Sequence, residues 1–340
     1  MSRRNLGHAL VIGVAILVSS GLLSPIAHAA PTLAQIQAQV RQLQEDAAAA
    51  AEGAQAAKVQ LATLTKTLIG IKQEASAQGA TVDSLKKSLG AIAIEQYKSG
   101  GLSQSLELLF SANPQLYLSS AGALESITRN KSVQLRKFKA AQQRLTATTL
   151  TVNDKLVLVQ AAQKRFTQDS ARAKAKLVAA EKLLANLKKE DRARLAALAA
   201  AQENSDQASS KAYAISAGAI SGRAGIAIKF ALKQIGDRYV FGAAGMVAWD
   251  CSGLTMRAYQ AAGVSMPHSA AAQAGYGRKV SLNALKPGDL LFYGRPISHV
   301  AIYLGGNKMV HAPRPGSRVK VVSDVVHAIG RKPLVAARRF

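Results

Sequence analysis

An apolar side chain recurs at every seventh position in the middle of the chain, and this repeat restricts the possible folds more than any other feature. The positions are Phe138, Leu145, Val152, Val159 and Phe166. Seven-residue spacing keeps these side chains on one seam of a long helix, so the segment is predicted to pack against another helix as a coiled coil. Such a rod is a lever, a spacer or a binding surface, and by itself it specifies no chemistry.

A second helical segment precedes the first. Residues 32–98 contain no proline, are rich in Ala, Gln, Leu, Lys and Glu, and place apolar residues at helical spacing. A Gly-Gly pair then ends the segment, and Pro114 prevents one continuous helix. We therefore expect an antiparallel helical hairpin over 30–207, with an apolar tip near 100–120 that either packs on the arms or receives a partner.

The composition changes after the second arm. Residues 208–221 are rich in Ala, Ser and Gly and are expected to form a linker, partly helical and partly flexible. Over 222–340, alternating and β-branched segments are separated by Gly- and Pro-rich turns. The predicted strands cover 289–293, 299–304, 309–312, 319–322 and 334–338. This second domain is therefore predicted to be α+β, with helices first and an antiparallel meander after them.

The N-terminus has the pattern of an export signal. Two arginines near the start precede an apolar run over 6–23, and an Ala-His-Ala tripeptide ending at Ala29 supplies the small residues of a cleavage site. We expect a signal peptide over 1–29 and a secreted or cell-envelope protein, with an uncleaved membrane anchor as the alternative. The arginine pair leaves both Sec and twin-arginine export open.

The chain is strongly basic, with a formal net charge of +25 at pH 7. This charge predicts a polyanion nearby, and nucleic acid is one candidate. The export signal favours anionic polymers of the cell wall or the membrane surface instead, so no nucleic-acid partner is expected.

The chain has one cysteine, Cys251. An exported protein with a single cysteine has no internal disulfide, so the thiol is either inert and buried or kept for chemistry. Asp250 is predicted to cap a helix that begins at Cys251 and runs through Tyr259. The free N–H groups of its first turn would favour a thiolate, and the N–H of Cys251 and the hydroxyl of Tyr239 are candidate oxyanion donors.

A thiol nucleophile needs a base and a group that orients the base. His299 opens one predicted strand and His311 ends the next, so antiparallel pairing would bring the two together. His268 and His327 lack this placement. A zinc site made by Cys251 and two histidines is the alternative, but no second cysteine and no close histidine pair at ligand spacing supports it.

At this point the second domain, about 222–340, resembles the NlpC/P60 family of cell-wall cysteine peptidases. The motifs that carry the resemblance occur in the expected order, and Asp-Cys-Ser-Gly alone would be weak. They are Tyr239-Val240-Phe241-Gly242, Asp250-Cys251-Ser252-Gly253-Leu254, Pro267-His268-Ser269 with Gln273, Leu285-Lys286-Pro287-Gly288-Asp289-Leu290, Ser298-His299-Val300-Ala301-Ile302-Tyr303 and His311-Ala312-Pro313.

The resemblance implies a papain-like fold that needs no metal and no cofactor. It implies peptidoglycan stem peptide as the substrate, cut between D-glutamate and the diamino acid at position three, and it leaves open whether that residue is diaminopimelate or lysine. The implied roles are nucleophile for Cys251, base for His299, orienting residue for His311, and a hydroxyl over the active site for Tyr239.

Proximity to the cysteine and the same resemblance predict that Asp250, Ser252 and Ser269 line the substrate cleft. The whole architecture resembles division-associated wall hydrolases, in which a helical hairpin is thought to restrain the enzyme until a membrane complex of the FtsEX type engages it. We therefore predict a secreted peptidoglycan endopeptidase whose hairpin or linker covers the cysteine. Two alternatives stay open: a non-catalytic coiled-coil scaffold or activator that binds wall peptides, and a Cys-His amidase or acyltransferase acting on another bond.

Overall fold

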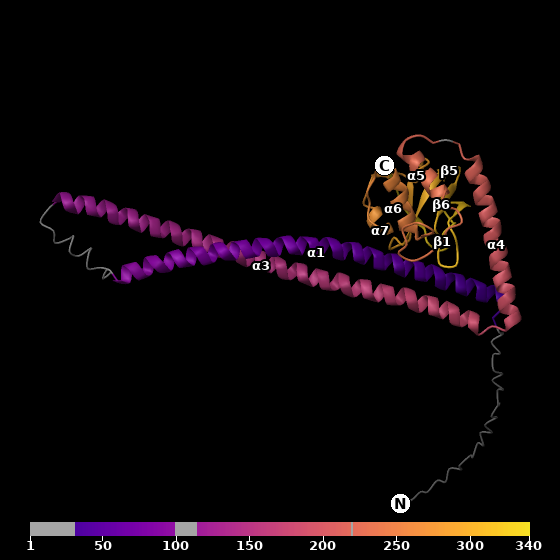
Figure 1. Cartoon of the computed structure of the whole chain (residues 1–340), viewed down its shortest axis with the longest axis horizontal. Helices are drawn as coiled ribbons and strands as arrows, with labels where there is room; N and C mark the ends of the chain where they lie inside the picture. Colours follow the sequence, from indigo (N-terminus) through magenta and orange to yellow (C-terminus); the bar gives the residue numbers. More distant parts are fainter. Residues whose placement is uncertain (1–30, 99–113, 219) are drawn as a thin grey trace, which may run out of the picture.

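The computed structural model of the chain describes residues 31–98, 114–218 and 220–340. The expected signal peptide (1–29) lies outside these ranges, as does most of the expected apolar tip (100–120). Two long helices extend away from a small domain that contains the sheet (Figure 1). Of the helices in the described ranges, none is both long and apolar enough to cross a membrane.

Three helices make up the first part of the molecule: α1 (Leu33–Lys98), α3 (Pro114–Ala185) and α4 (Lys189–Ser216). α1 and α3 run antiparallel and pack along each other, whereas α4 turns away and follows the side of the small domain (Figure 1). Small residues permit the close packing of the pair. A Cβ at Gly53 of α1, for example, would lie 2.8 Å from the Asp169 carboxylate of α3. The predicted pairing of two long helices is therefore present.

Two boundaries differ from the prediction. The second arm was expected to continue to Gln207, but α3 ends at Ala185 and a separate helix follows. The segment 208–221 was expected to be a linker, partly helical and partly flexible; α4 continues to Ser216, so the helical part covers most of it. The Ala-rich sequence has high helix propensity, and contacts with the sheet hold the helix in place. α5 then begins at Gly222, the residue at which the second domain was expected to start.

The small domain contains three helices and eight strands. The helices are α5 (Gly222–Leu232), α6 (Cys251–Ala261) and the short α7 (Ala270–Gln273). The strands are β1 (Arg238–Tyr239), β2 (Ala248–Trp249), β3 (Arg278–Val280), β4 (Leu290–Tyr293), β5 (His299–Gly305), β6 (Lys308–His311), β7 (Lys320–Ser323) and β8 (Leu334–Arg339).

Six of these strands form one antiparallel sheet, in the order β3-β8-β4-β5-β6-β7. All four residues of β4 are buried, because the sheet is covered on both faces. Leu290 and Phe292 belong to the apolar cluster beneath α5 and α6, and Leu291 and Tyr293 belong to a second cluster. The predicted α+β domain with an antiparallel meander is confirmed.

The edge strand β7 is covered by α4. The Ser210 hydroxyl accepts a hydrogen bond from the backbone N–H of Val321 (2.9 Å), and the Gln207 amide donates to the carbonyl of Val319 (3.2 Å). Side-chain groups of α4 thus satisfy backbone groups that an open sheet edge would expose. This contact explains why the presumed linker is ordered as a helix.

Candidate active site

The lone cysteine is the first residue of α6. Asp250 caps this helix as predicted, and its carboxylate accepts a 2.6 Å hydrogen bond from the N–H of Gly253. The other carboxylate oxygen accepts from the N–H of Gly242 at 2.9 Å, which ties the preceding loop to the start of the helix. The cap therefore sets the position of Cys251 relative to the segment that carries Tyr239.

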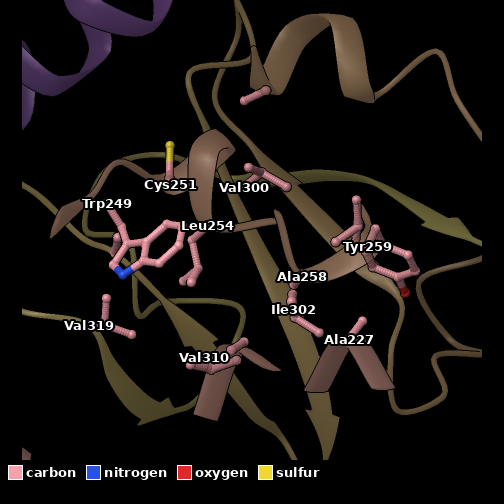
Figure 2. Close-up of a cluster of buried hydrophobic side chains, with 14 of the residues drawn as sticks. Ala227, Trp249, Cys251, Leu254, Ala258, Tyr259, Val300, Ile302, Val310 and Val319 are labelled. Atoms are coloured by element: carbon pink, nitrogen blue, oxygen red, sulfur yellow. The ribbon is translucent and has the colours of Figure 1, made fainter. Parts of the chain in front are cut away.

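The thiol of Cys251 lies at the margin of the larger apolar cluster, and its sulfur points away from the other labelled side chains (Figure 2). The residue is only 1% exposed. Burial raises the pKa of the thiol well above its ordinary value, and the charges of Glu52 and Asp250 raise it further. A hydrogen bond from the backbone of Val300 in β5 acts in the opposite direction. The thiol is thus protonated in this arrangement, and it lies beside the start of β5.

The two predicted histidines meet next to this point. His299 opens β5, His311 ends β6, and Nε2 of the first lies 2.9 Å from Nδ1 of the second. The rings are nearly perpendicular, at 89°. Both side chains are buried, and Nε2 of His311 has no hydrogen-bond partner among the described residues. The bond to His311 holds the His299 ring in one orientation.

Burial also determines the protonation of this pair. It lowers the pKa of His299 well below the ordinary value, with further lowering by His311 and Lys332. Burial, assisted by the charges of Lys320 and Arg314, lowers the pKa of His311 to about 3. Both imidazoles are therefore neutral at pH 7, so His299 is free to accept a proton.

Tyr239 lies in β1 and is almost fully buried. Its ring contacts Phe241 edge-on, with the centroids 5.6 Å apart. Burial raises the pKa of its phenol well above the ordinary value, and the charges of Cys251, Asp250 and Glu52 raise it further. The hydroxyl is thus a neutral group within the electrostatic reach of the thiol.

The three residues predicted to line a substrate cleft occupy different positions. Ser252 lies next to the thiol on α6, and its hydroxyl is 2.5 Å from the carboxylate of Glu52. Ser269 caps α7 and is fully buried. The carboxylate of Asp250 is occupied by its cap bonds and by His268. Of the three, Ser252 is the residue whose side chain bonds to Glu52 of the distant helix α1.

His268 was set aside in the sequence analysis, yet the structure brings it to the site. Its Nε2 lies 2.8 Å from Oδ1 of Asp250 and 2.9 Å from Oδ2. Burial opposes the charged form, but the hydrogen bond to Asp250 and its charge outweigh burial and raise the pKa of His268. The Pro-His-Ser motif that contains His268 was visible in the sequence. Nothing in the sequence indicated that this segment, which leads into α7, lies against the cap of α6.

Gln273 is fully buried and joins α6 to the loop before α7. Its amide nitrogen donates to the carbonyl oxygens of Ser252 (2.8 Å) and Pro267 (2.9 Å), and its amide oxygen accepts from the hydroxyl of Thr255 (2.7 Å). These bonds fix the distance between Ser252 and the start of α7, and thus the width of the site on that side.

Glu52 is a site residue that the sequence analysis did not predict. It belongs to α1 and lies 200 residues from Ser252 in sequence. One carboxylate oxygen accepts hydrogen bonds from Cys251 Sγ (3.2 Å) and Ser252 Oγ (2.5 Å), and the other accepts from the N–H of Ala270 (2.9 Å). Burial and the negative charge of Asp250 raise its pKa, and the three hydrogen bonds oppose that rise. No sequence signal distinguishes this glutamate, which lies in an Ala-rich helical stretch.

Metal binding has no counterpart in the described residues, where no three His, Cys, Asp or Glu side chains converge as ligands. The arrangement is a thiol at a helix N-terminus, beside the strand of an antiparallel sheet that begins with a neutral, oriented imidazole. It has the components of a thiol–imidazole hydrolase site.

Comparison with known proteins agrees with this class. Residues 236–339 match the model of the NlpC/P60 family. The small domain is therefore an NlpC/P60 domain, as its motifs predicted, and it is joined here to a long helical hairpin. Its motifs occupy the elements described above, with the cysteine on α6 and the histidines on β5 and β6.

Individual relatives match over a similar length. The chain is 42% identical over 113 residues to a probable endopeptidase of Mycobacterium tuberculosis, covering 33% of this chain and 28% of that protein. It is 36% identical over 110 residues to the gamma-D-glutamyl-L-lysine dipeptidyl-peptidase of Bacillus subtilis, covering 31% and 37%. It is 35% identical over 122 residues to the peptidoglycan endopeptidase RipA of Mycobacterium tuberculosis, covering 32% and 25%.

The matched region thus spans between 25% and 37% of the length of these curated relatives. Among solved structures, the crystal structure of the NlpC/p60 domain of the peptidoglycan hydrolase SagA is 38% identical and covers 34% of this chain and 98% of that chain, with a TM-score of 0.32.

Proposed function

We propose that the protein is a secreted peptidoglycan endopeptidase. It cuts the stem peptide between D-glutamate and the residue at position three, and it acts at the cell envelope in cell separation or wall remodelling. The observation that carries the proposal is the placement of Cys251 at the start of α6, beside the strand that begins with the oriented base His299. The names of the matched relatives, which include peptidoglycan endopeptidases, support the choice of substrate.

The proposed reaction uses four groups that act directly and one, His311, that positions the base. His299 takes the proton of Cys251, and the thiolate attacks the carbonyl carbon of the γ-glutamyl bond. The oxyanion is stabilised by the N–H of Cys251 and the hydroxyl of Tyr239. His299 then protonates the departing amine, and water, deprotonated by the same imidazole, hydrolyses the thioester and regenerates the thiol. His311 acts by holding the ring of His299.

The proposal includes the site of action and the partners. A signal peptide over 1–29 would export the chain, and its net charge of +25 would concentrate it on anionic wall polymers. The helical hairpin would restrain the enzyme until a membrane division complex of the FtsEX type engages it. The support for this last step is the architecture: two long helices attached to one small hydrolase domain.

Digestion of purified walls tests the proposal. Because Glu52 contacts the thiol, both the full chain and its Glu52→Ala variant are incubated with walls, and each is paired with a Cys251→Ala version. Mass spectrometry of the soluble muropeptides should show fragments ending in D-glutamate only where the thiol is present. Fragments cut at another bond would indicate the amidase or acyltransferase alternative, and the absence of any thiol-dependent product would contradict the proposal.

A further inference from the structure

A carboxylate from α1 occupies the position that a substrate needs. Glu52 is 3% exposed although it lies on a helix that is mostly solvent-exposed beyond residue 58. Its two oxygens take three donors: the thiol of Cys251, the hydroxyl of Ser252 and the N–H of Ala270. Such complete pairing is what a buried carboxylate requires. The domain therefore presents three hydrogen-bond donors that together bind an acceptor, and the Glu52 carboxylate of the same chain occupies that position.

We propose that Glu52 is an internal plug of the active site, and that α1 blocks the enzyme by holding this carboxylate against Cys251, Ser252 and Ala270. The inference rests on the proposed function and names the residue through which the hairpin restrains it. A substrate carbonyl cannot reach the sulfur while the Glu52 oxygen lies 3.2 Å from it. Withdrawal of α1 from the domain would remove the carboxylate and free its three donors.

The plug also suppresses the nucleophile electrostatically. A thiol that donates to a carboxylate must lose that bond before His299 receives its proton. The negative charge of Glu52 adds to burial in raising the pKa of the Cys251 thiol. The blocked state is thus inactive both because the position is occupied and because the thiolate is disfavoured.

The surface of α1 is shaped for this contact. Ala48, one turn before Glu52 and on the same face, is 3% exposed and packs into the apolar cluster that contains Tyr239. Gln55, on the other side, lies where a Cβ at Gly242 would approach its amide to 3.0 Å. Gln42, farther back along the helix, accepts a 3.1 Å hydrogen bond from Arg331. Contacts on both sides of the cleft hold the helix across it.

The contact has the character of a reversible one. A hollow of about 750 Å³ remains between α1, α3 and the domain, and its lining includes charged side chains such as Lys176 and Lys332. Glu52 makes its hydrogen bonds to neutral donors only, and it interacts with the basic groups of His268 and Lys332 through charge, without a hydrogen bond to either. A polar, incompletely filled interface of this kind resembles those between domains that move relative to one another.

Alkylation of the single cysteine tests the plug without depending on wall hydrolysis. The full chain and its variants are treated with iodoacetamide at pH 7, and the rate is followed by intact mass. Glu52→Ala removes the carboxylate and should raise the rate by about tenfold or more, since the thiol becomes accessible and loses a negative neighbour. Glu52→Gln keeps the size but turns an amide N–H₂ toward at least one donor, so it should also raise the rate. Glu95→Ala, at an exposed position of the same helix, should stay within about twofold of the wild type.

The outcomes separate the plug from the proposed function. Faster alkylation of both Glu52 variants supports the plug even if no wall fragment is released, in which case the proposed activity is wrong. A wild-type alkylation rate in Glu52→Ala, with an unchanged circular dichroism spectrum, overturns the plug. Should that variant be unfolded, an unchanged rate in folded Glu52→Gln overturns it equally.

Discussion

Two helices of the hairpin region contact the NlpC/P60 domain, and they do so in different ways. α4 pairs opposite charges: the Lys320 ammonium of β7, itself buried, lies 3.1 Å from Glu203 and 2.7 Å from Asp206. α1 buries the carboxylate of Glu52 among neutral donors and against the negative Asp250. The first contact is at the edge strand of the sheet, the second at the thiol.

This difference suggests different tasks for the two helices. A paired charge resists separation because removing one partner leaves the other buried and uncompensated. Glu52 has no basic group at hydrogen-bond distance, and burial raises its pKa, so its carboxylate gains less from the buried position and is easier to withdraw. α4 therefore serves as the attachment of the domain, and α1 as the part that moves. The following experiments are meant to separate these tasks.

The largest effect on thiol access is expected from a substitution that displaces α1 with a large side chain. Ala48 is buried in the apolar cluster between α1 and the domain, which has no room for an arginine side chain and whose apolar side chains offer no partner for its charge. Ala48→Arg should therefore separate α1 from the domain and raise the rate of Cys251 alkylation by about a hundredfold. The matched control is Ala62→Arg, at an exposed position of the same helix, which should leave the rate unchanged. If Ala48→Arg protects the thiol as the wild type does, α1 does not govern access to the site.

Substitutions in the contact between α4 and β7 should lower the free energy of unfolding more than they change the alkylation rate of Cys251. Replacing Glu203 and Asp206 together by alanine leaves Lys320 without its partners and should lower the free energy of unfolding by about 2–3 kcal/mol, a value reduced by the partial exposure of the carboxylates. The measurement is urea unfolding followed by the fluorescence of Trp249, the single tryptophan, which is buried in the domain.

The control for this experiment is the same change at Glu190 and Asp191, in the first turn of α4, where loss of favourable helix-dipole interactions should cost less than about 1 kcal/mol. An alkylation rate that rises in the Glu203/Asp206 variant as much as in Ala48→Arg would contradict the division of tasks, because both helices would then control the cleft.

The smallest expected effect is the loss of folding stability when the pH is lowered. The folded-state pKa of His311 is about 3 against an ordinary value of 6.5, so the unfolded chain binds the proton more readily. Stability is fully present above pH 6.5 and falls as the pH drops toward 3. Between pH 7 and 5.5 the loss through His311 should be about 1.3 kcal/mol, read from the same fluorescence transition.

The acid experiment also leaves the α4 contact unaffected in that range. Although burial opposes it, hydrogen bonds and the charge of Lys320 lower the pKa of Glu203 and Asp206, so both stay ionised between pH 7 and 5.5. The control His311→Asn should show a flatter dependence of stability on pH. A variant that loses as much as the wild type would mean that another group titrates.

Much of the domain followed from local patterns. The five predicted strands lie within one or two residues of their predicted bounds, because alternation and turn residues are properties of neighbouring positions, whereas the short strands β1, β2 and β3 were not predicted. The cap at Asp250 and the meeting of His299 with His311 could be predicted for the same reason: one is a local hydrogen bond, and the other follows from the pairing of consecutive strands.

The errors occurred where a distant segment determines the local structure. Residues 208–216 have a composition compatible with helix or linker, and bonds such as that between Ser210 and Val321 settle the choice. His268 was set aside because its partner, Asp250, is 18 positions away and not on an adjacent strand. In both cases the deciding interaction is absent from the local sequence.

By itself, then, the sequence determined that a thiol would begin a helix capped by Asp250, near two histidines in an NlpC/P60 domain, and that two long helices would precede it. Only the tertiary structure decided that one of those helices lies across the thiol and inserts Glu52. Periodicity specifies which face of α1 is apolar, but a glutamate in an Ala-rich stretch has the same pattern whether it faces water or a cleft. Its partners come from α6 and α7, and the folded arrangement alone brings them within hydrogen-bonding distance.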